Sequence, residues 1–218
     1  MKLYIAPGAC SFASHVVVHE LGLPVEVVTV SLTDPQGLHK QVSPFGRVPA
    51  LQLDDGTLIT ENTAILPFLA DLKPNTSLFA PAGSVERAQI QSWLGYLSSE
   101  VHTGSFRPIN RPGRYHPDEA QHGQVRASGI ALLRAALAPI AAHLQTRTWL
   151  VGERFTIADA YLGVFLGWLA RAPGKPFKDE TLDAFFSRYQ QRAAVRAAFE
   201  AEAELLHAAT GANNKTSK

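Results

Sequence analysis

The sequence contains only one cysteine among its 218 residues, Cys10, so no disulfide bond can form within the chain. A chain without disulfides depends on its buried core for stability. Because such chains usually reside in a reducing cytosol, we expect a cytoplasmic protein.

An excess of charge of either sign is also missing. The chain has 20 lysines and arginines against 19 aspartates and glutamates, which gives a formal net charge of +1. Its basic residues do not cluster among aromatic ones, so we expect no nucleic-acid partner. The N-terminus shows no basic region followed by a long apolar run, and no segment stands out as a bilayer span, so we expect no membrane association.

The composition, with 46% hydrophobic and 18% charged residues, is typical of a soluble globular protein. In the first third, short β-rich runs alternate with helical ones. Gly22 is placed to end a helix, and Asp54-Asp55-Gly56 to turn a hairpin. This βαβ-ββα order predicts an α/β thioredoxin-like domain over residues 1–74. The expected strands are 2–6, 25–31, 48–54 and 57–60, and the expected helices are 11–21 and 61–72.

The remainder of the chain is helical in pattern. Residues 75–85 are predicted to be a linker, residues 86–207 an all-α domain, and the polar residues 208–218 a flexible tail. Thr156 with Asp159 matches a variant of the helix capping box, which indicates a role in folding. Helices are expected at 84–103, 119–145, 156–170, 181–190 and 195–208, with prolines marking breaks such as 173–176.

Cys10 lies in "PGACS", where the first strand passes into a helix. The first N–H groups of a helix lack partners within it and, with the helix dipole, favour negative charge nearby. A thiol there ionises more easily, and the thiolate is the nucleophile, so Cys10 is a candidate reactive sulfur. The alternative is a buried packing residue, because free cysteine is among the most buried residue types.

Two further segments suggest binding. A cis peptide bond at Val48-Pro49 would leave the N–H and C=O of Val48 free to pair with an extended peptide, although Pro49 also suits a strand start. Thr60 and Glu61 are explained by capping of the next helix. In the alternative interpretation that helix end binds a carboxylate while Glu61 attracts an ammonium group, which together fit an amino-acid head.

Four segments in this order cover most of the chain and together resemble the bacterial glutathione transferases of the beta class: "MKLYIAPGACS", "GRVPALQLDDGTLITENTAI", "SSEVHTGSF" and "FTIADAYL". The resemblance implies a thioredoxin-like domain joined to an all-α domain, a homodimer, and glutathione bound along the Val48-Pro49 edge. Cys10 would face the glutathione sulfur, with Ser11 as a second stabilising group and His102 as the histidine near the sulfur. The implied glutathione-binding residues are Ala9, Cys10, Arg47, Val48, Pro49, Glu61, Asn62 and His102.

Two further questions concern the basic group that binds the glycine carboxylate and a possible metal site. A basic group for the glycine carboxylate of glutathione has three possible sources, His39, Lys40 and Arg47. His15 and His19 are four residues apart on one predicted helix, but no carboxylate stands at zinc-ligand spacing from them, so we expect no metal.

We therefore carry three hypotheses for function. The first is an enzyme of detoxification that conjugates glutathione to small apolar electrophiles. The second is a glutathione-dependent oxidoreductase or peroxidase in which Cys10 forms a mixed disulfide, by a monothiol route because position 13 is Ala13. The third is a protein that binds glutathione or an apolar ligand without turnover.

Overall fold

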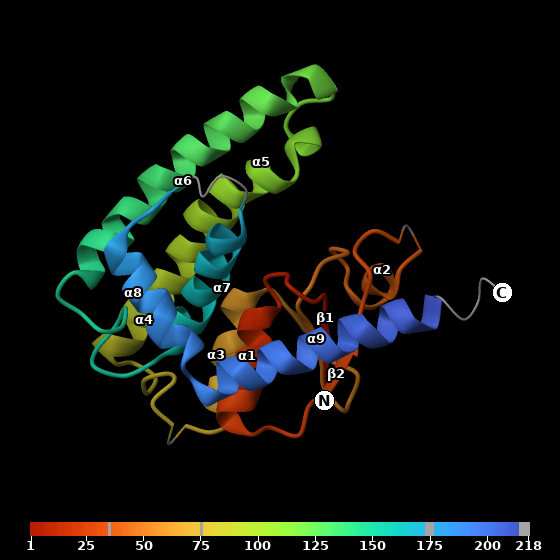
Figure 1. Cartoon of the computed structure of the whole chain (residues 1–218). Helices are drawn as coiled ribbons and strands as arrows, with labels where there is room; N and C mark the ends of the chain where they lie inside the picture. The colour runs from red at the N-terminus through yellow and green to blue at the C-terminus, as the bar shows by residue number, and fades with distance from the viewer. Residues whose placement is uncertain (35, 75, 173–176, 214–218) are drawn as a thin grey trace. The chain divides into compact units, whose positions relative to one another are not determined.

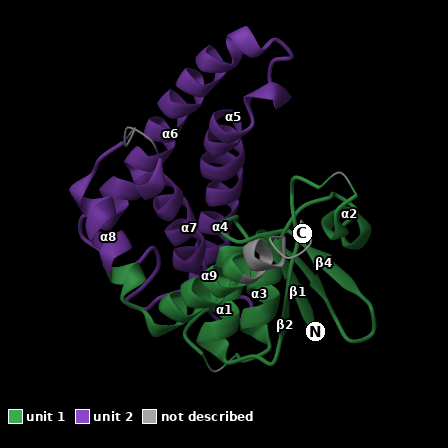
Figure 2. Cartoon of the chain, turned by 45° about the vertical axis from the view of Figure 1, so that its right-hand side comes forward, with its two compact units in different colours: residues 1–79, 188–218 green, residues 80–187 purple. Residues whose placement is uncertain are grey.

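The computed structural model describes residues 1–34, 36–74, 76–172 and 177–213 (Figure 1). The chain forms two compact units, residues 1–79 with 188–218, and residues 80–187 (Figure 2).

The first unit contains a four-stranded mixed sheet in the order β2-β1-β3-β4. The central strand β1 (Lys2–Ile5) pairs in parallel with β2 (Glu26–Thr29) and antiparallel with β3 (Ala50–Gln52), which in turn pairs antiparallel with β4 (Leu58–Thr60). Three successive apolar residues of β1 are buried, as expected for a strand in the middle of a covered sheet. The sequence prediction of a thioredoxin-like α/β sheet is confirmed.

Helix α1 (Phe12–Leu21) begins one residue later than predicted and ends at Gly22, which adopts a left-handed φ of 55°. It contacts α3 (Asn62–Asp71) and the long helix α9 (Ala193–Asn213), which runs beside it in Figure 1. A short helix, α2 (Leu38–Val42), lies in a segment for which the sequence predicted no regular structure.

The capping role predicted for Thr60 and Glu61 is wrong. Thr60 is the last residue of β4, and Glu61 itself occupies the N-cap position of α3 without a capping hydrogen bond from its side chain. Glu61 is the only non-glycine residue with positive φ, at 68°, in the part of the chain that the structure describes. Because this conformation is unfavourable for a side chain, it marks Glu61 as a candidate functional residue.

The C-terminal helix belongs by contact to the first unit, whereas the sequence assigned residues 86–207 to a helical domain. The reason is a set of long-range contacts with α1, which are made by α9 and by the residue just before it. Arg192 forms an ion pair with Glu20, and Glu202 contacts His15. The predicted tail begins within α9, which is described to Asn213, and residues 214–218 lie outside the described part.

The second unit is helical. Its helices are α4 (Val85–Tyr96), the π-helix η1 (Leu97–Phe106), α5 (Arg107–Asn110), the short turns η2 (Pro112–Arg114) and η3 (Glu119–Gln121), α6 (His122–Leu144), α7 (Ile157–Arg171) and most of α8 (Glu180–Gln190). The predicted helix over 84–103 thus continues as α4 and η1 in succession. The predicted break at 173–176 lies outside the described residues.

The start of α7 confirms the predicted capping box. The fully buried carboxylate of Asp159 accepts hydrogen bonds of 2.8 Å from the backbone N–H groups of Leu150 and Thr156 and from the Thr156 hydroxyl. Burial raises the pKa of Asp159 to about 6, although these hydrogen bonds act in the opposite direction.

One described segment, Glu119–Leu144, is long and apolar enough to cross a membrane by length and composition alone. This finding corrects the sequence expectation that no such segment exists. Core helices of soluble proteins pass the same test, and α6, which makes up most of the segment, contacts η1 and α5 within the helical unit.

Candidate active site

The Cys10 turn, residues 6–12, connects β1 to α1. Within it, the N–H of Ala9 donates to the carbonyl of Ala6 at 2.9 Å, and the N–H of Phe12 donates to the carbonyl of Ala9 at 3.1 Å. The buried Ser11 hydroxyl lies 3.2 Å from both the N–H and the carbonyl oxygen of Ala6. Ser11 therefore closes the turn on itself and holds Cys10 in place.

The Cys10 thiol is partly buried and donates a hydrogen bond to the backbone carbonyl of Val48, with 3.3 Å between sulfur and oxygen. The Val48-Pro49 peptide bond is cis, which is the alternative under which we expect Val48 to pair with a peptide. The predicted reactive sulfur and the predicted peptide-binding residue are thus neighbours in the first unit.

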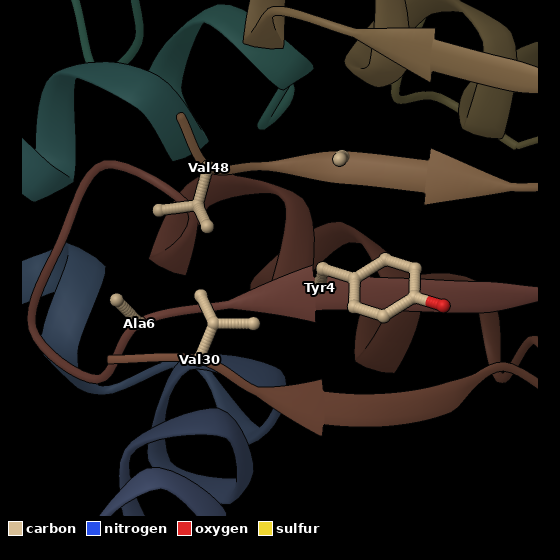
Figure 3. Close-up of a cluster of buried hydrophobic side chains, with 5 residues drawn as sticks. Tyr4, Ala6, Val30 and Val48 are labelled. Atoms are coloured by element: carbon tan, nitrogen blue, oxygen red, sulfur yellow. The ribbon is translucent and has the colours of Figure 1, made fainter. Parts of the chain in front are cut away.

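A hydrophobic cluster fixes Val48. The Val48 side chain is buried with Tyr4, Ala6 and Val30, and Figure 3 shows the side chains of Val48 and Val30 pointing toward each other with Ala6 beside them. Ala9 packs against the same cluster. Since both sides of the sulfur–oxygen contact are anchored in one apolar core, the contact is a feature of the folded unit.

Asn62, at the first position of α3, is hydrogen-bonded to the Cys10 turn. Its side chain is 3% exposed, and its amide nitrogen donates to the Cys10 carbonyl at 2.9 Å. Its amide oxygen accepts a hydrogen bond of 2.7 Å from the buried Ser14 hydroxyl. The side chain predicted to clamp glutathione is therefore already engaged in positioning the thiol residue.

Glu202 on α9 attaches to the other side of the turn. Its side chain is buried, and one carboxylate oxygen accepts a 2.7 Å hydrogen bond from the N–H of Gly8, which has a φ of 75°. The other oxygen lies 3.2 Å from Nδ1 of the buried His15, whose ring is 4.9 Å from that of His19. Burial and the neighbouring His15 lower the pKa of His19.

The Glu202 carboxylate also affects the phenol of Tyr189. Burial and the nearby carboxylates of Glu202 and Glu20 raise the pKa of Tyr189 above its ordinary value, so this phenol stays protonated.

Glu61 and Arg47 form an exposed ion pair beside this turn. Their nearest oxygen and nitrogen are 3.8 Å apart, and each side chain is about half exposed. Of the other possible basic groups, His39 is buried and Lys40 is exposed. Among the three basic candidates, Arg47 lies next to Val48 in sequence and forms an ion pair with Glu61, the residue predicted to bind the ammonium group.

His102 lies in the second unit, on the π-helix η1. The Ser105 hydroxyl donates to the Glu100 carbonyl, five residues back, at 2.7 Å, which suits the wide turn of a π-helix. Nδ1 of His102 lies 3.2 Å from the hydroxyl of the buried Tyr161. Its ring also lies 5.3–5.4 Å from those of Phe165 and Trp168.

The structure thus places most of the predicted site residues in the first unit and His102 in the second. No feature of the sequence singled out Glu202, which is one of several glutamates in an alternating stretch, or Ser14, which lies inside an apolar helix. Among the described residues, no group of three or more histidines, cysteines, aspartates or glutamates is arranged to hold a metal ion.

Comparison with known proteins gives a consistent picture. Residues 9–72 match the family model "Glutathione S-transferase, N-terminal domain", and residues 123–201 match "Glutathione S-transferase, C-terminal domain". Glutathione S-transferase GstA of Escherichia coli O157:H7 is 40% identical over 206 residues, which covers 93% of this chain and 98% of that protein.

Solved structures agree with the sequence matches. A ternary complex of BphK, a bacterial glutathione S-transferase, is 36% identical with a TM-score of 0.83, covering 93% of this chain and 100% of that one. A sphingomonad glutathione S-transferase complexed with glutathione is 36% identical with a TM-score of 0.82, covering 93% and 99%. A beta-class enzyme from Sphingomonas chungbukensis is 35% identical with a TM-score of 0.81, covering 93% and 98%.

Proposed function

Since this chain belongs to the bacterial glutathione S-transferases and is an enzyme that conjugates glutathione, we propose that the Cys10 turn and the Val48-Pro49 segment form its glutathione thiol site. The observation that carries the proposal is the 3.3 Å contact between the Cys10 sulfur and the Val48 carbonyl oxygen. A peptide that pairs with the Val48 backbone as an added strand would bring its own side chain to this sulfur. In glutathione that side chain is the reacting thiol.

The amino-acid head of glutathione is assigned to Glu61 and the N-terminus of α3. A γ-glutamyl group carries an ammonium and a carboxylate on one carbon, and Glu61, which pairs with Arg47 at 3.8 Å in the structure, directly precedes this helix end. Glu61 takes the ammonium, as the sequence suggested. The carboxylate goes to the first N–H groups of α3, which have no acceptor within the helix, so Asn62 contributes through its backbone and not its side chain.

Arg47 thereby becomes available when the ammonium displaces it from Glu61. Of the three basic groups considered, Arg47 is our choice for the glycine carboxylate, because His39 is buried. An exposed ion pair contributes only about 0–1 kcal/mol, so its rearrangement costs little.

Catalysis consists of holding the glutathione sulfur as an anion for attack on an electrophile. Stabilised thiolate is the better nucleophile, and a fixed position supplies much of the rate. His102 is our second candidate for a group near that sulfur, on the family resemblance alone. We assign small apolar electrophiles as the substrate class, in a homodimeric cytoplasmic enzyme of detoxification.

A second activity is favoured by the partial exposure of Cys10. Its thiolate can attack the glutathione sulfur of a mixed disulfide between glutathione and another thiol, which forms a disulfide between Cys10 and glutathione and releases the other thiol as its thiolate. A second glutathione thiolate then attacks the disulfide at Cys10, restores the Cys10 thiolate and yields glutathione disulfide. Because Ala13 stands where a second cysteine would resolve the intermediate, this route depends on free glutathione.

The test compares conjugation of a chlorinated nitroaromatic with reduction of a glutathione mixed disulfide, in the native enzyme and in Cys10→Ala. If conjugation is the main activity, Cys10→Ala lowers it only in part, because the Val48 backbone and Glu61 still position glutathione. Thiol transfer disappears in the same variant. Binding of glutathione without turnover in either assay contradicts the proposal.

A further inference from the structure

The contact between Cys10 and Val48 affects the ionisation of the thiol. A neutral thiol donates its proton to the carbonyl oxygen, whereas a thiolate has no proton to donate and meets the negative end of the carbonyl dipole. A hydrogen bond that only the neutral form can make favours the neutral form. At 3.3 Å, the Val48 carbonyl therefore opposes formation of the Cys10 thiolate in the protein without a bound peptide.

The thiol residue is held in this position from several sides. Asn62 holds the Cys10 carbonyl, Ser11 closes the turn onto Ala6, and Glu202 holds the N–H of Gly8. Val48 is equally fixed by its buried side chain in the cluster of Figure 3. These contacts hold the backbone of Cys10 and the side chain of Val48, so the sulfur and the carbonyl oxygen stay within reach of each other in the folded unit.

The N-terminus of α1 acts in the opposite direction. Its partial positive charge favours the thiolate, and Cys10 lies just before the N-cap residue Ser11. The helix end and the Val48 carbonyl thus act on the thiol in opposite directions, and the Val48 carbonyl is also the group assigned to the incoming peptide. A ligand that occupies this carbonyl removes the influence that keeps the thiol neutral.

We propose that the main chain of glutathione activates Cys10: a peptide N–H of the ligand donates to the Val48 carbonyl and thereby releases the Cys10 proton to solvent. The proposal rests on the proposed function, because it requires glutathione to pair with the Val48 backbone. The donor is the N–H of the cysteinyl residue of glutathione, since it is the N–H nearest to the sulfur that faces Cys10. A carbonyl oxygen has two lone pairs, but donation to either one reduces its negative charge toward the thiolate.

The consequence is a lone cysteine that is inert until its co-substrate arrives. A neutral thiol reacts slowly with oxidants and alkylating agents, whereas the thiolate reacts readily. The free enzyme therefore keeps Cys10 protected, and the thiolate forms when an uncharged glutathione sulfur, such as that of a mixed disulfide, lies beside it; beside a glutathione thiolate, repulsion between like charges opposes a second anion.

Titratable and charged groups also lie on the elements that hold this contact. Glu202 with its partner His15 and Glu61 with its partner Arg47 are joined to it most directly, His19 and Glu20 lie further along α1, and Tyr4 lies in the cluster around Val48. His102 belongs to the second unit. The experiment must therefore separate the effect of the peptide N–H from the effect of the ligand's own charges.

Thiolate absorbance in the ultraviolet measures Cys10 directly, because it is the only cysteine in the chain. The pH titration is recorded with and without saturating S-methylglutathione, which has no free thiol, and the Cys10→Ser variant supplies the background. The matched ligand is the ester analogue of S-methylglutathione, in which an oxygen replaces the N–H between the γ-glutamyl and cysteinyl residues. It keeps every charge and loses only the donor.

S-methylglutathione should lower the midpoint of the thiolate titration by about one unit, which is a tenfold higher ratio of thiolate to thiol at a given pH. The ester analogue should leave the midpoint near that of the free enzyme. The same result in His102→Gln shows that the shift does not require His102. Equal shifts from both ligands, or a midpoint that S-methylglutathione leaves unchanged or raises, overturn the inference.

Calorimetry and the conjugation assay distinguish the two levels of failure. An enzyme that binds S-methylglutathione and conjugates glutathione, but shows no shift in the thiolate titration, contradicts only the activation of Cys10. An enzyme that neither binds S-methylglutathione nor turns over glutathione contradicts the proposed function and this inference together.

Discussion

The carboxylate of Glu202 accepts a hydrogen bond of 2.7 Å from the backbone N–H of Gly8, although 194 positions separate the two residues in the sequence. This bond ties the C-terminal helix to the turn that carries the single cysteine. The second oxygen of the carboxylate contacts His15 on the helix that the turn begins. The end of the chain therefore contributes to the geometry of a site near its start.

Replacement of Glu202 tests this link. Glu202→Ala leaves the Gly8 N–H and His15 without their acceptor, so we expect a loss of about 3 kcal/mol in the free energy of unfolding. Glu202→Gln keeps an oxygen for Gly8 and should lose less. Urea denaturation measures both, with Glu204→Ala, an exposed glutamate on the same helix, as the control. If Glu202→Ala is as stable as the Glu204→Ala control, the bond contributes nothing to stability.

Asn62 should act on Cys10 through position. Asn62→Ala removes the hydrogen bonds to the Cys10 carbonyl and from Ser14, for which we expect a loss of roughly 1–3 kcal/mol in stability. Because the thiol then loses its fixed distance to Val48, the rate of Cys10 alkylation in the free enzyme should rise. Mass spectrometry of timed samples measures this rate. Thr63→Ala, at the next position of the same helix, should leave it unchanged.

Glu61 is predicted to bind the ammonium group of glutathione. Glu61→Gln should weaken glutathione binding by roughly 1–3 kcal/mol, the range for a charge-assisted hydrogen bond. Stability should change little, because the ion pair with Arg47 is half exposed. Calorimetry measures the glutathione affinity of Glu61→Gln and of a control, Glu26→Gln. The control breaks another exposed ion pair of the first unit, the one between Glu26 and Lys2. Equal affinity in Glu61→Gln and the native enzyme would remove Glu61 from the site.

Asp159 should make stability depend on pH. Its pKa is about 6 in the folded protein and 3.8 in the reference state, so the unfolded chain gives up this proton at lower pH than the native one. The contribution of this group to stability is therefore full below about pH 4 and is lost as the pH rises to about 6. Urea denaturation across this range should show this decline in the native enzyme.

Asp159→Asn supplies the comparison, because an amide does not titrate. Its amide nitrogen also faces a backbone N–H, so the variant should be less stable by about 2–4 kcal/mol at neutral pH. The difference in stability between the native enzyme and Asp159→Asn should shrink as the pH rises from about 4 to 6. A constant difference across that range would contradict the assigned titration.

Local signals in the sequence predicted the elements of the fold. Gly22 ends α1 because only a residue without a side chain adopts the left-handed conformation at low cost, and Thr156 with Asp159 begins α7 because the two side chains complete each other's hydrogen bonds. Glu61 shows the limit of such reasoning. Its residue type suits a helix start, yet its positive φ and its ion pair with Arg47 follow from the path of the chain after β4.

The sequence by itself determined the place of the four strands and of the longer helices, the single thiol at a strand–helix junction and, through its motifs, the family. Only the tertiary structure decided what the thiol touches. The Val48 carbonyl, the Asn62 amide and the Glu202 carboxylate reach the Cys10 turn from positions 38, 52 and 194 residues away from their partners. Hydrophobic periodicity and capping report on neighbours within a few residues, whereas a hydrogen bond between distant segments depends on how the whole unit packs, and no short stretch of sequence encodes it.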